Sequence, residues 1–391
     1  MSANLDSFRT DTRAWLEAHC PPEMRSPIRS EDDVCWGGRD WTFASEGQRQ
    51  WLEAMAGCGW TVPDWPADYG GGGLSPGETK VLKEEMARIG ARSPLTSFGI
   101  SMLGPALLQF GTEEQKKHYL PEIARGEIRW CQGYSEPGAG SDLAGLQTKC
   151  EDKGDHWLVN GQKVWTSYAN QADWIFCLVR TSSESKHGGI SFLLFDMESP
   201  GVTTRPIRLI SGYSPFTQTF FDNVKVPKEN LLGELNQGWT IAKYLLTHER
   251  NMIGGMGTQR VTPLSQLAVK NIGLASGRLA EPALRTDIAR FEMDAMAFAL
   301  TMNRVTDEAK AGNETGAMSS MLKYYGTELN KRRAELTMSV AGSEGLRFGD
   351  SHSEEHLAAM WLRTKGNSIE GGTSEVQLNI IAKSVLRLPG A

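Results

Sequence analysis

The middle of the chain reads HWLVNGQKVW at residues 156–165. Two apolar arms flank Asn160-Gly161, and an Asn-Gly pair readily takes the two left-handed positions of a type I′ turn, so this stretch predicts a β-hairpin. The Gly188-Gly189 pair predicts a loop between two later strands. Further apolar runs predict strands at 174–179, 190–195, about 203–210 and about 217–226. Together they predict a small β-domain of five or six strands.

Both flanks of this β-domain show the apolar spacing of helices. Helices are expected at 46–56, 75–90, from Thr112 onward, 237–255, 261–277, 281–312, 316–344, 352–366 and after Thr373. No helices separate the strands, which excludes a doubly wound nucleotide fold. The fold class predicted is α+β with three domains: an N-terminal α-helical domain at 1–125, a central small β-barrel domain at 126–235, and a C-terminal helical domain like a four-helix bundle at 236–391.

The composition excludes several classes of protein. The 391 residues carry a net charge of −6, which does not favour a nucleic-acid partner. The six cysteines form no CxxC pair, so neither a zinc site nor a disulfide framework is indicated. No apolar run approaches the ~18 residues that a transmembrane helix needs, and the first residues lack a signal-peptide pattern. We therefore expect a cytoplasmic protein.

A glycine-rich stretch, YSEPGAGSD, occupies residues 134–142 at the start of the β-domain. Its glycines leave backbone N–H groups uncovered, and its hydroxyls add further donors and acceptors, a composition that suits an anion or the edge of a polar heterocycle. The stretch is not a dinucleotide fingerprint, because Leu143 stands where the third glycine belongs, and no P-loop lysine follows. The alternative is an ordinary turn.

Glu249 lies in an apolar part of a predicted helix. The residues three and four positions away from it are Leu245, Leu246, Met252 and Ile253. Desolvation raises the pKa of such a carboxylate toward the range that suits a general base. The alternative is a carboxylate at the edge of the core that is paired with an arginine.

Two other positions allow two interpretations each. Trp165 is either a core side chain or an exposed indole that stacks on a ring system. Thr373 is expected to cap the last helix, whose N-terminus would also attract negative charge.

Several motifs together resemble the acyl-CoA dehydrogenase family. They are YSEPGAGSDLAG at 134–145, NGQKVWTS at 160–167, GTSEVQ at 372–377, and the glycine- and tryptophan-bearing segment at 59–71. The resemblance spans nearly the whole chain and implies an FAD enzyme that oxidises an acyl-CoA to its trans-2-enoyl-CoA. In that reaction a carboxylate removes the α-proton and flavin N5 accepts the β-hydride.

The resemblance also implies roles for individual residues. Tyr134 and Ser135 would lie along the flavin ring, and Trp165 and Ser167 would line its ring and ribityl side. The remaining roles fall on residues near phosphates: Ser141 at the flavin or CoA phosphates, Thr373 and Glu375 near the adenosine or pyrophosphate, and Arg250 at the CoA nucleotide.

The position of the catalytic base differs between branches of this family. Most members carry it in a Tyr-Glu-Gly-Thr sequence, where this chain has Gly371, with Glu370 one residue early. A smaller branch places it on the helix after the β-domain, within a Glu-Arg pair that Glu249-Arg250 matches. The resemblance therefore implies Glu249 as the base, with the backbone N–H of Gly371 donating to the thioester oxygen.

Two family motifs for contacts between subunits are absent. Residues 268–291 contain no Arg-x-x-Phe-Gly, and the Gln-x-x-Gly-Gly-x-Gly pattern is reduced to SVAGSEG at 339–345. This departure favours a heteromer whose other subunit supplies the arginine, as in bacterial members that act on steroid-type CoA thioesters, and leaves a homo-oligomeric dimer or tetramer as the alternative. Electron-transfer flavoprotein is the acceptor that the resemblance implies. A flavin oxidase or monooxygenase, or a non-catalytic partner subunit, remains an alternative function.

Overall fold

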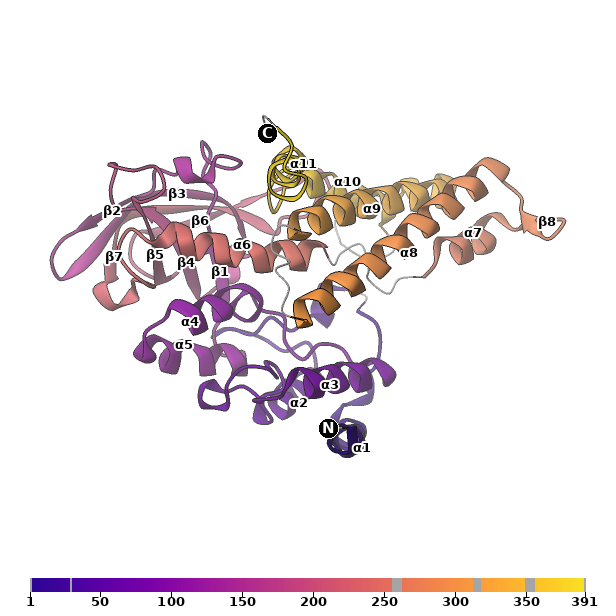
Figure 1. Cartoon of the computed structure of the whole chain (residues 1–391), viewed down its shortest axis with the longest axis horizontal. Helices are drawn as coiled ribbons and strands as arrows, with labels where there is room; N and C mark the ends of the chain where they lie inside the picture. The colour runs from indigo at the N-terminus through magenta and orange to yellow at the C-terminus, as the bar shows by residue number, and fades with distance from the viewer. Residues whose placement is uncertain (1, 29, 255–261, 312–317, 349–355, 390–391) are drawn as a thin grey trace. The chain divides into compact units, whose positions relative to one another are not determined.

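The computed structural model describes residues 2–28, 30–254, 262–311, 318–348 and 356–389. The chain divides into two compact units, which are described separately. The first unit comprises Met1–Pro206 and Phe216–Ala242, and the second comprises Ile207–Pro215 and Lys243–Ala391. The mixed architecture of helices and one large sheet confirms the predicted α+β class (Figure 1).

In the described part of the chain, the α-helices that precede the sheet are α1 (Ser2–His19), α2 (Glu46–Gly57), α3 (Pro76–Arg88), α4 (Gly104–Phe110) and α5 (Glu113–Arg125). The predicted start of α5 is confirmed, since Thr112 Oγ1 accepts a hydrogen bond from the N–H of Gln115. A comparable capping box at Ser75 starts α3. The buried side chains of Leu16, Trp51 and Leu82 join α1, α2 and α3 in one core.

A buried carboxylate ties α1 to α3. Glu85 of α3 accepts hydrogen bonds from Arg9 and Arg13 of α1 at 2.9–3.0 Å, and from Arg88 at 2.7 Å. The hydrogen bond from Arg13 outweighs the effect of burial and, with those from Arg88 and Arg9, lowers the pKa of Glu85 to about 2.

The central sheet has seven strands in the order β1-β4-β2-β3-β7-β6, with β5 paired to β4. They are β1 (Trp130–Gly133), β2 (Lys149–Asp152), β3 (His156–Ser167), β4 (Trp174–Arg180), β5 (Ile190–Asp196), β6 (Val202–Ile207) and β7 (Phe216–Pro227). The strands predicted at 174–179, 190–195 and about 217–226 are confirmed. The strand predicted at about 203–210 is confirmed as β6, which ends earlier, at Ile207. Buried apolar residues of β3, β4, β5 and β7 form the core of this sheet.

The predicted hairpin at Asn160-Gly161 is wrong. β3 runs without a turn from His156 to Ser167 because it pairs with β2 and, over its length, with β7. Of the pair, Gly161 alone has a positive φ (150°), and the register shifts here. The result is a bulge in β7, where Asp222 and Asn223 lie opposite Asn160 alone, and the N–H of Asn223 donates to Asn160 Oδ1 at 2.8 Å.

The C-terminal part is helical and follows α6 (Gly238–Gly254), which begins in the first unit. Its elements are α7 (Leu264–Ile272), the short strands β8 (Leu274–Ala275) and β9 (Arg278–Leu279), α8 (Pro282–Lys310), α9 (Met318–Ala341), α10 (Leu357–Thr364) and α11 (Ser374–Ile380). A core of buried residues that includes Ile288, Phe298 and Leu329 joins α8 to α9 (Figure 1).

The helix predicted at 261–277, whose first residue lies outside the described residues, is wrong after Ile272. It ends at Ile272 because Gly273 and Gly277 adopt positive φ values of 86° and 74° around a two-residue hairpin. Among the described residues, none of the helices has both the length and the apolar character needed to cross a bilayer.

Candidate active site

The residues after β1, from Tyr134 onward, form an edge of the first unit that ring contacts and backbone hydrogen bonds hold in place. The ring of Tyr134 meets Phe176 and Phe192 edge to face, at 6.2 and 6.3 Å between ring centroids. The carbonyl of Ser135 accepts a hydrogen bond from the N–H of Val164 at 2.8 Å, which joins this edge to β3. A tight turn follows, in which Glu136 and Ala139 exchange backbone hydrogen bonds.

An ion pair is buried beneath this edge. Lys163 of β3 is fully buried, and its Nζ lies 2.8 Å from Glu136 Oε1. Glu136 also accepts from the Oγ1 and N–H of Thr148 and from the N–H of Gln147. Burial alone raises the pKa of Glu136, but the Lys163 charge and these hydrogen bonds together hold it below its usual range.

Our sequence reasoning missed this pair. The signal was present, because Lys163 occupies an inward-facing position of a strand whose other inward positions include Trp157 and Val159. A lysine at such a position is rarely buried unless a partner is within reach.

Trp165 is exposed, which excludes the core interpretation. Its side chain is 53% exposed and meets Phe216 edge to face at 5.8 Å. Its φ of 61° is unusual for an aromatic residue, and Tyr168 repeats the feature with a φ of 53°. Left-handed backbone at non-glycine residues stores strain and clusters at functional sites. Ser167, half-buried, lies between these two positions.

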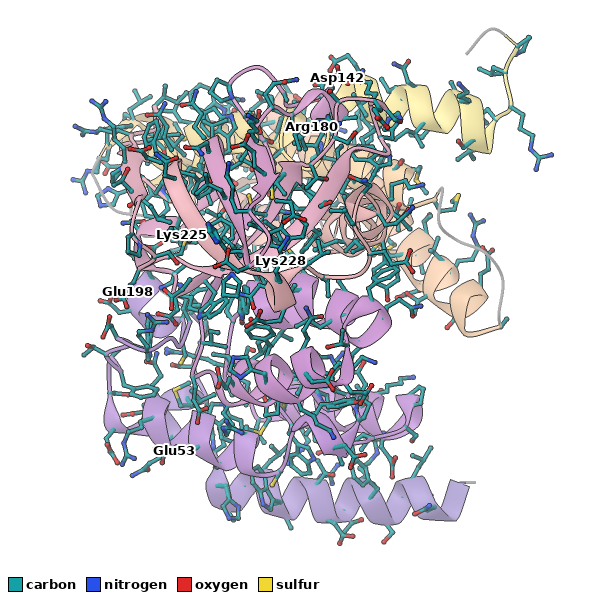
Figure 2. The ribbon with its side chains drawn as sticks, turned by 90° about the vertical axis from the view of Figure 1, so that its left-hand side faces the viewer. Glu53, Asp142, Arg180, Glu198, Lys225 and Lys228 are labelled. Atoms are coloured by element: carbon teal, nitrogen blue, oxygen red, sulfur yellow. The ribbon has the colours of Figure 1, made fainter. Side chains whose placement is uncertain are left out.

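The glycine-rich turn leaves open space beside this edge. A Cβ atom at Gly138 or Gly140 would meet nothing within 4 Å, so contacts with the chain do not require glycine there. Ser141 and the adjacent Asp142, which is labelled in Figure 2, are both exposed. Asp142 pairs with Lys186. An exposed indole, a held backbone edge and an open glycine turn together fit a planar heterocycle that bears polar groups.

The second unit holds the other group of predicted residues. Gly371 and Gly372 adopt φ values of 65° and 93°, and the side chain of Thr373 caps α11 at the N–H of Val376, as predicted. The buried Lys323 donates to the carbonyl of Gly372 at 2.8 Å, and Gln377 donates to the carbonyl of Gly371 at 2.9 Å. Glu375 is exposed in the first turn of α11.

The structure describes the side chain of one candidate base, Glu370, but not that of the other, Glu249. Glu370 is engaged within the second unit, because Arg363 donates to its Oε2 at 2.7 Å and Asn367 donates to its Oε1. Glu249 and Arg250 belong to the backbone of α6, but their side chains lie outside the described residues. One turn earlier, Leu245 is fully buried.

The structure thus groups the predicted residues in two places. Tyr134, Ser135, Trp165 and Ser167 come together in the first unit through the contact of the β1 edge with β3. Gly371, Thr373 and Glu375 come together in the second unit at the start of α11.

Three family models match the chain along its length. They describe the N-terminal domain of acyl-CoA dehydrogenase at residues 4–127, its middle domain at 131–224 and its C-terminal domain at 236–386. Acyl-CoA dehydrogenase IpdE1 of Mycobacterium tuberculosis is 35% identical over 387 residues, which cover 99% of this chain and 98% of that protein. Glutaryl-CoA dehydrogenase of Desulfococcus multivorans is 32% identical and covers 76% of this chain and 78% of its own length.

Solved structures agree with these sequence comparisons. The Tcur3481-Tcur3483 steroid ACAD superposes with a TM-score of 0.79 at 31% identity, covering 100% of this chain and 98% of that chain. The ChsE4-ChsE5 complex from Mycobacterium tuberculosis superposes with a TM-score of 0.73 at 29% identity, covering 99% and 98%. This chain therefore belongs to the acyl-CoA dehydrogenase family, as an oxidoreductase that acts on acyl-CoA with FAD as its cofactor.

Proposed function

We propose that this enzyme converts an acyl-CoA thioester to its trans-2-enoyl-CoA, with Glu249 as the base that removes the α-proton. FAD, when bound, would supply the two-electron acceptor for the hydride that leaves the β-carbon, with flavin N5 as the proposed accepting atom. Family membership over the full length of the chain supports the reaction, and the engagement of Glu370 by Arg363 and Asn367 supports the choice of base.

Four residues of the first unit would hold the flavin. Tyr134 and Ser135 present a backbone edge and a hydroxyl, Trp165 an exposed indole, and Ser167 a second hydroxyl at the end of β3. This proposal rests on the exposure of the Trp165 indole and on its strained backbone at the register shift of β3.

Glu249 suits the role of base because of its helix. It lies four residues after the buried Leu245, and apolar surroundings favour the protonated form of a carboxylate, which makes the carboxylate more basic. In the first step, Glu249 takes the proton from the carbon next to the thioester carbonyl.

The backbone N–H of Gly371 would stabilise the charge that this step creates. As the α-proton leaves, negative charge develops on the thioester oxygen, and a positioned N–H donor lowers the energy of that state. Hydrogen bonds from Gln377 and Lys323 hold the carbonyls of Gly371 and Gly372, so the loop is fixed before substrate binds.

The phosphate-bearing parts of substrate and cofactor would contact four further residues. We assign Arg250 to the CoA nucleotide, Ser141 to the flavin or CoA phosphates, and Thr373 and Glu375 to the adenosine or pyrophosphate. The helix N-terminus that Thr373 caps favours negative charge, whereas the carboxylate of Glu375 would accept hydrogen bonds from hydroxyl or amino groups.

Two substitutions test the base. In the FAD-loaded enzyme, Glu249→Gln removes the proton acceptor, so we expect anaerobic bleaching of the flavin by acyl-CoA to slow by at least about a hundredfold, the low end for general-base catalysis. Glu370→Gln is the matched control and should bleach at a rate within about tenfold of the wild type. The reverse pattern would transfer the role to Glu370.

We propose further that the enzyme acts on a bulky, steroid-type CoA thioester as one subunit of a heteromer. The absence of Arg-x-x-Phe-Gly from residues 268–291 supports this, because a neighbouring subunit of different sequence could supply that arginine. Two related structures, a steroid ACAD and the ChsE4-ChsE5 complex, also support this proposal. The sequence has no nicotinamide fingerprint, so we assign an external electron-transfer flavoprotein as acceptor.

The domain limits 1–125, 126–235 and 236–391 are part of this proposal.

A further inference from the structure

Lys163 contacts a single peptide group of the proposed flavin edge. Its ammonium donates to the carbonyl oxygen of Tyr134 at 3.1 Å and to Glu136 Oε1 at 2.8 Å. Because all described peptide bonds are trans, the N–H of Ser135, which belongs to the same peptide group as the Tyr134 carbonyl, points away from that carbonyl. The Lys163 ammonium therefore lies on the carbonyl side of this peptide group, and the Ser135 N–H faces the opposite side.

Burial of the Lys163–Glu136 ion pair in the core carries a large cost in desolvation free energy. Burying an ammonium and a carboxylate requires that both be desolvated, and a buried ion pair is often no more stabilising than apolar side chains of similar volume. Stability alone therefore does not account for the pair. Its distinct physical effect is directional, since an ammonium that donates to a carbonyl oxygen polarises the whole amide and strengthens its N–H as a donor.

The carboxylate of Glu136 keeps the ammonium in this place. Glu136 Oε1 accepts from Lys163 Nζ, from Thr148 Oγ1 at 2.6 Å and from the N–H of Thr148 at 2.8 Å. Its Oε2 accepts from the N–H of Gln147 at 2.6 Å. Glu136 thus has partners on both oxygens and cannot follow Lys163 to another rotamer without losing several hydrogen bonds.

We propose that Lys163, held by Glu136, is a positioning residue for the flavin: it fixes the Tyr134–Ser135 peptide and strengthens the Ser135 N–H as a donor to the bound ring. This inference rests on the proposed placement of the flavin against Tyr134, Ser135 and Trp165. Lys163 does not contact the cofactor in this arrangement and acts through one peptide group.

The test compares FAD affinity with stability. Lys163→Met removes the donor and leaves Glu136 unpaired, so we expect both the unfolding temperature and FAD affinity to fall. The double variant Glu136→Gln/Lys163→Met removes both charges and should regain most of the stability. We expect its FAD dissociation constant, from flavin fluorescence, to stay at least about tenfold above wild type, because a charge-assisted hydrogen bond has been lost. Its flavin should also have a more negative reduction potential.

Two further variants complete the design. Thr148→Val removes one hydrogen bond to Glu136 and should weaken FAD binding by about threefold with little loss of stability, so it serves even if the charge variants do not fold. Lys228→Met is the control. Lys228, labelled in Figure 2, pairs with Asp152 near the start of β3. This end of β3 is roughly 20 Å from Lys163, the length of six residues of strand, so the substitution should leave FAD affinity unchanged.

The outcomes separate this inference from the proposal beneath it. Wild-type FAD affinity and potential in the stable double variant, or wild-type affinity in Thr148→Val if the double variant does not fold, would show that the pair serves only the fold. If Trp165→Gly also leaves FAD affinity unchanged, the proposed flavin face itself is wrong. If Trp165→Gly weakens binding while the Lys163 and Thr148 variants do not, the flavin face stands and the positioning role is rejected.

Discussion

The exposure of Trp165 could not be predicted from its sequence alone. Its sequence context allowed either a core side chain or a stacking surface, because strand alternation does not define a face where the register shifts. The structure has such a shift between Lys163 and Thr166, and the indole is exposed as a result. The burial of Lys163 was not predicted, because its partner Glu136 is distant in sequence from β3.

Replacing Trp165 should separate binding from folding. We expect Trp165→Gly to change the free energy of unfolding of the apoprotein by no more than about 1 kcal/mol, because relief of the left-handed strain offsets the lost contact with Phe216. FAD affinity should fall by at least about tenfold, the effect of losing an aromatic stacking surface. Chemical denaturation and FAD titration measure the two quantities.

Trp51 provides the contrast for this measurement. It is a fully buried tryptophan, and Trp51→Ala should destabilise the protein by about 3–5 kcal/mol. A loss of that size in Trp165→Gly would contradict the separation of binding from folding at this residue.

Secondary-structure elements were predictable where their signals are local. Caps at Thr112 and Thr373 and the runs of β4 and β5 depend on neighbouring residues, and all were confirmed. The hairpin prediction failed because the partner of β3 along most of its length is β7, some sixty residues later, and non-local pairing overrode the turn preference of Asn160-Gly161.

The contact between α1 and α3 should make stability depend on pH. The pKa of Glu85 is about 2 in the folded chain and near 4.3 when unfolded, so its contribution is present at neutral pH and is lost as the pH falls from about 4.5 toward 2. Glu85→Gln should lose about 2–4 kcal/mol at pH 7, because three arginines lose a charged partner, and should show a flatter acid limb in denaturation measurements.

An exposed pair serves as the control for this prediction. Glu53, on the surface of α2, pairs with Arg49 within one helix. Glu53→Gln should change stability by less than about 1 kcal/mol and should keep the acid limb of the wild type. Parallel acid limbs in Glu85→Gln and wild type would contradict the assignment to Glu85.

At the scale of the whole chain, the order of helices, strands and helices was enough to predict the class, because hydrophobic period alone separates the blocks. The site was predictable only as a set of residues. The hydrogen bonds that hold the carbonyls of Gly371 and Gly372 depend in part on Lys323, which lies far away in the sequence, and no local pattern records such a contact.

Assembly provides the prediction at this scale. If a different subunit supplies the missing arginine, the purified chain alone should bind FAD below stoichiometry and turn over acyl-CoA slowly, because part of the cofactor lacks a charged partner. Native mass spectrometry and a ferricenium-coupled assay of the same sample test this. Homotetramers that are fully loaded with FAD and active would exclude the heteromer.

In each of the two units, a buried lysine donates a hydrogen bond to a backbone carbonyl. Lys163 donates to the Tyr134 carbonyl and Lys323 to the Gly372 carbonyl, and both side chains are fully buried. Free amines on a protein surface are nucleophiles that slowly capture acyl groups from thioesters, the class of compound on which this enzyme acts. Since these two amines are shielded from solvent, adventitious acylation would accumulate on surface lysines, while the two lysines that hold the loops of the candidate site stay chemically intact.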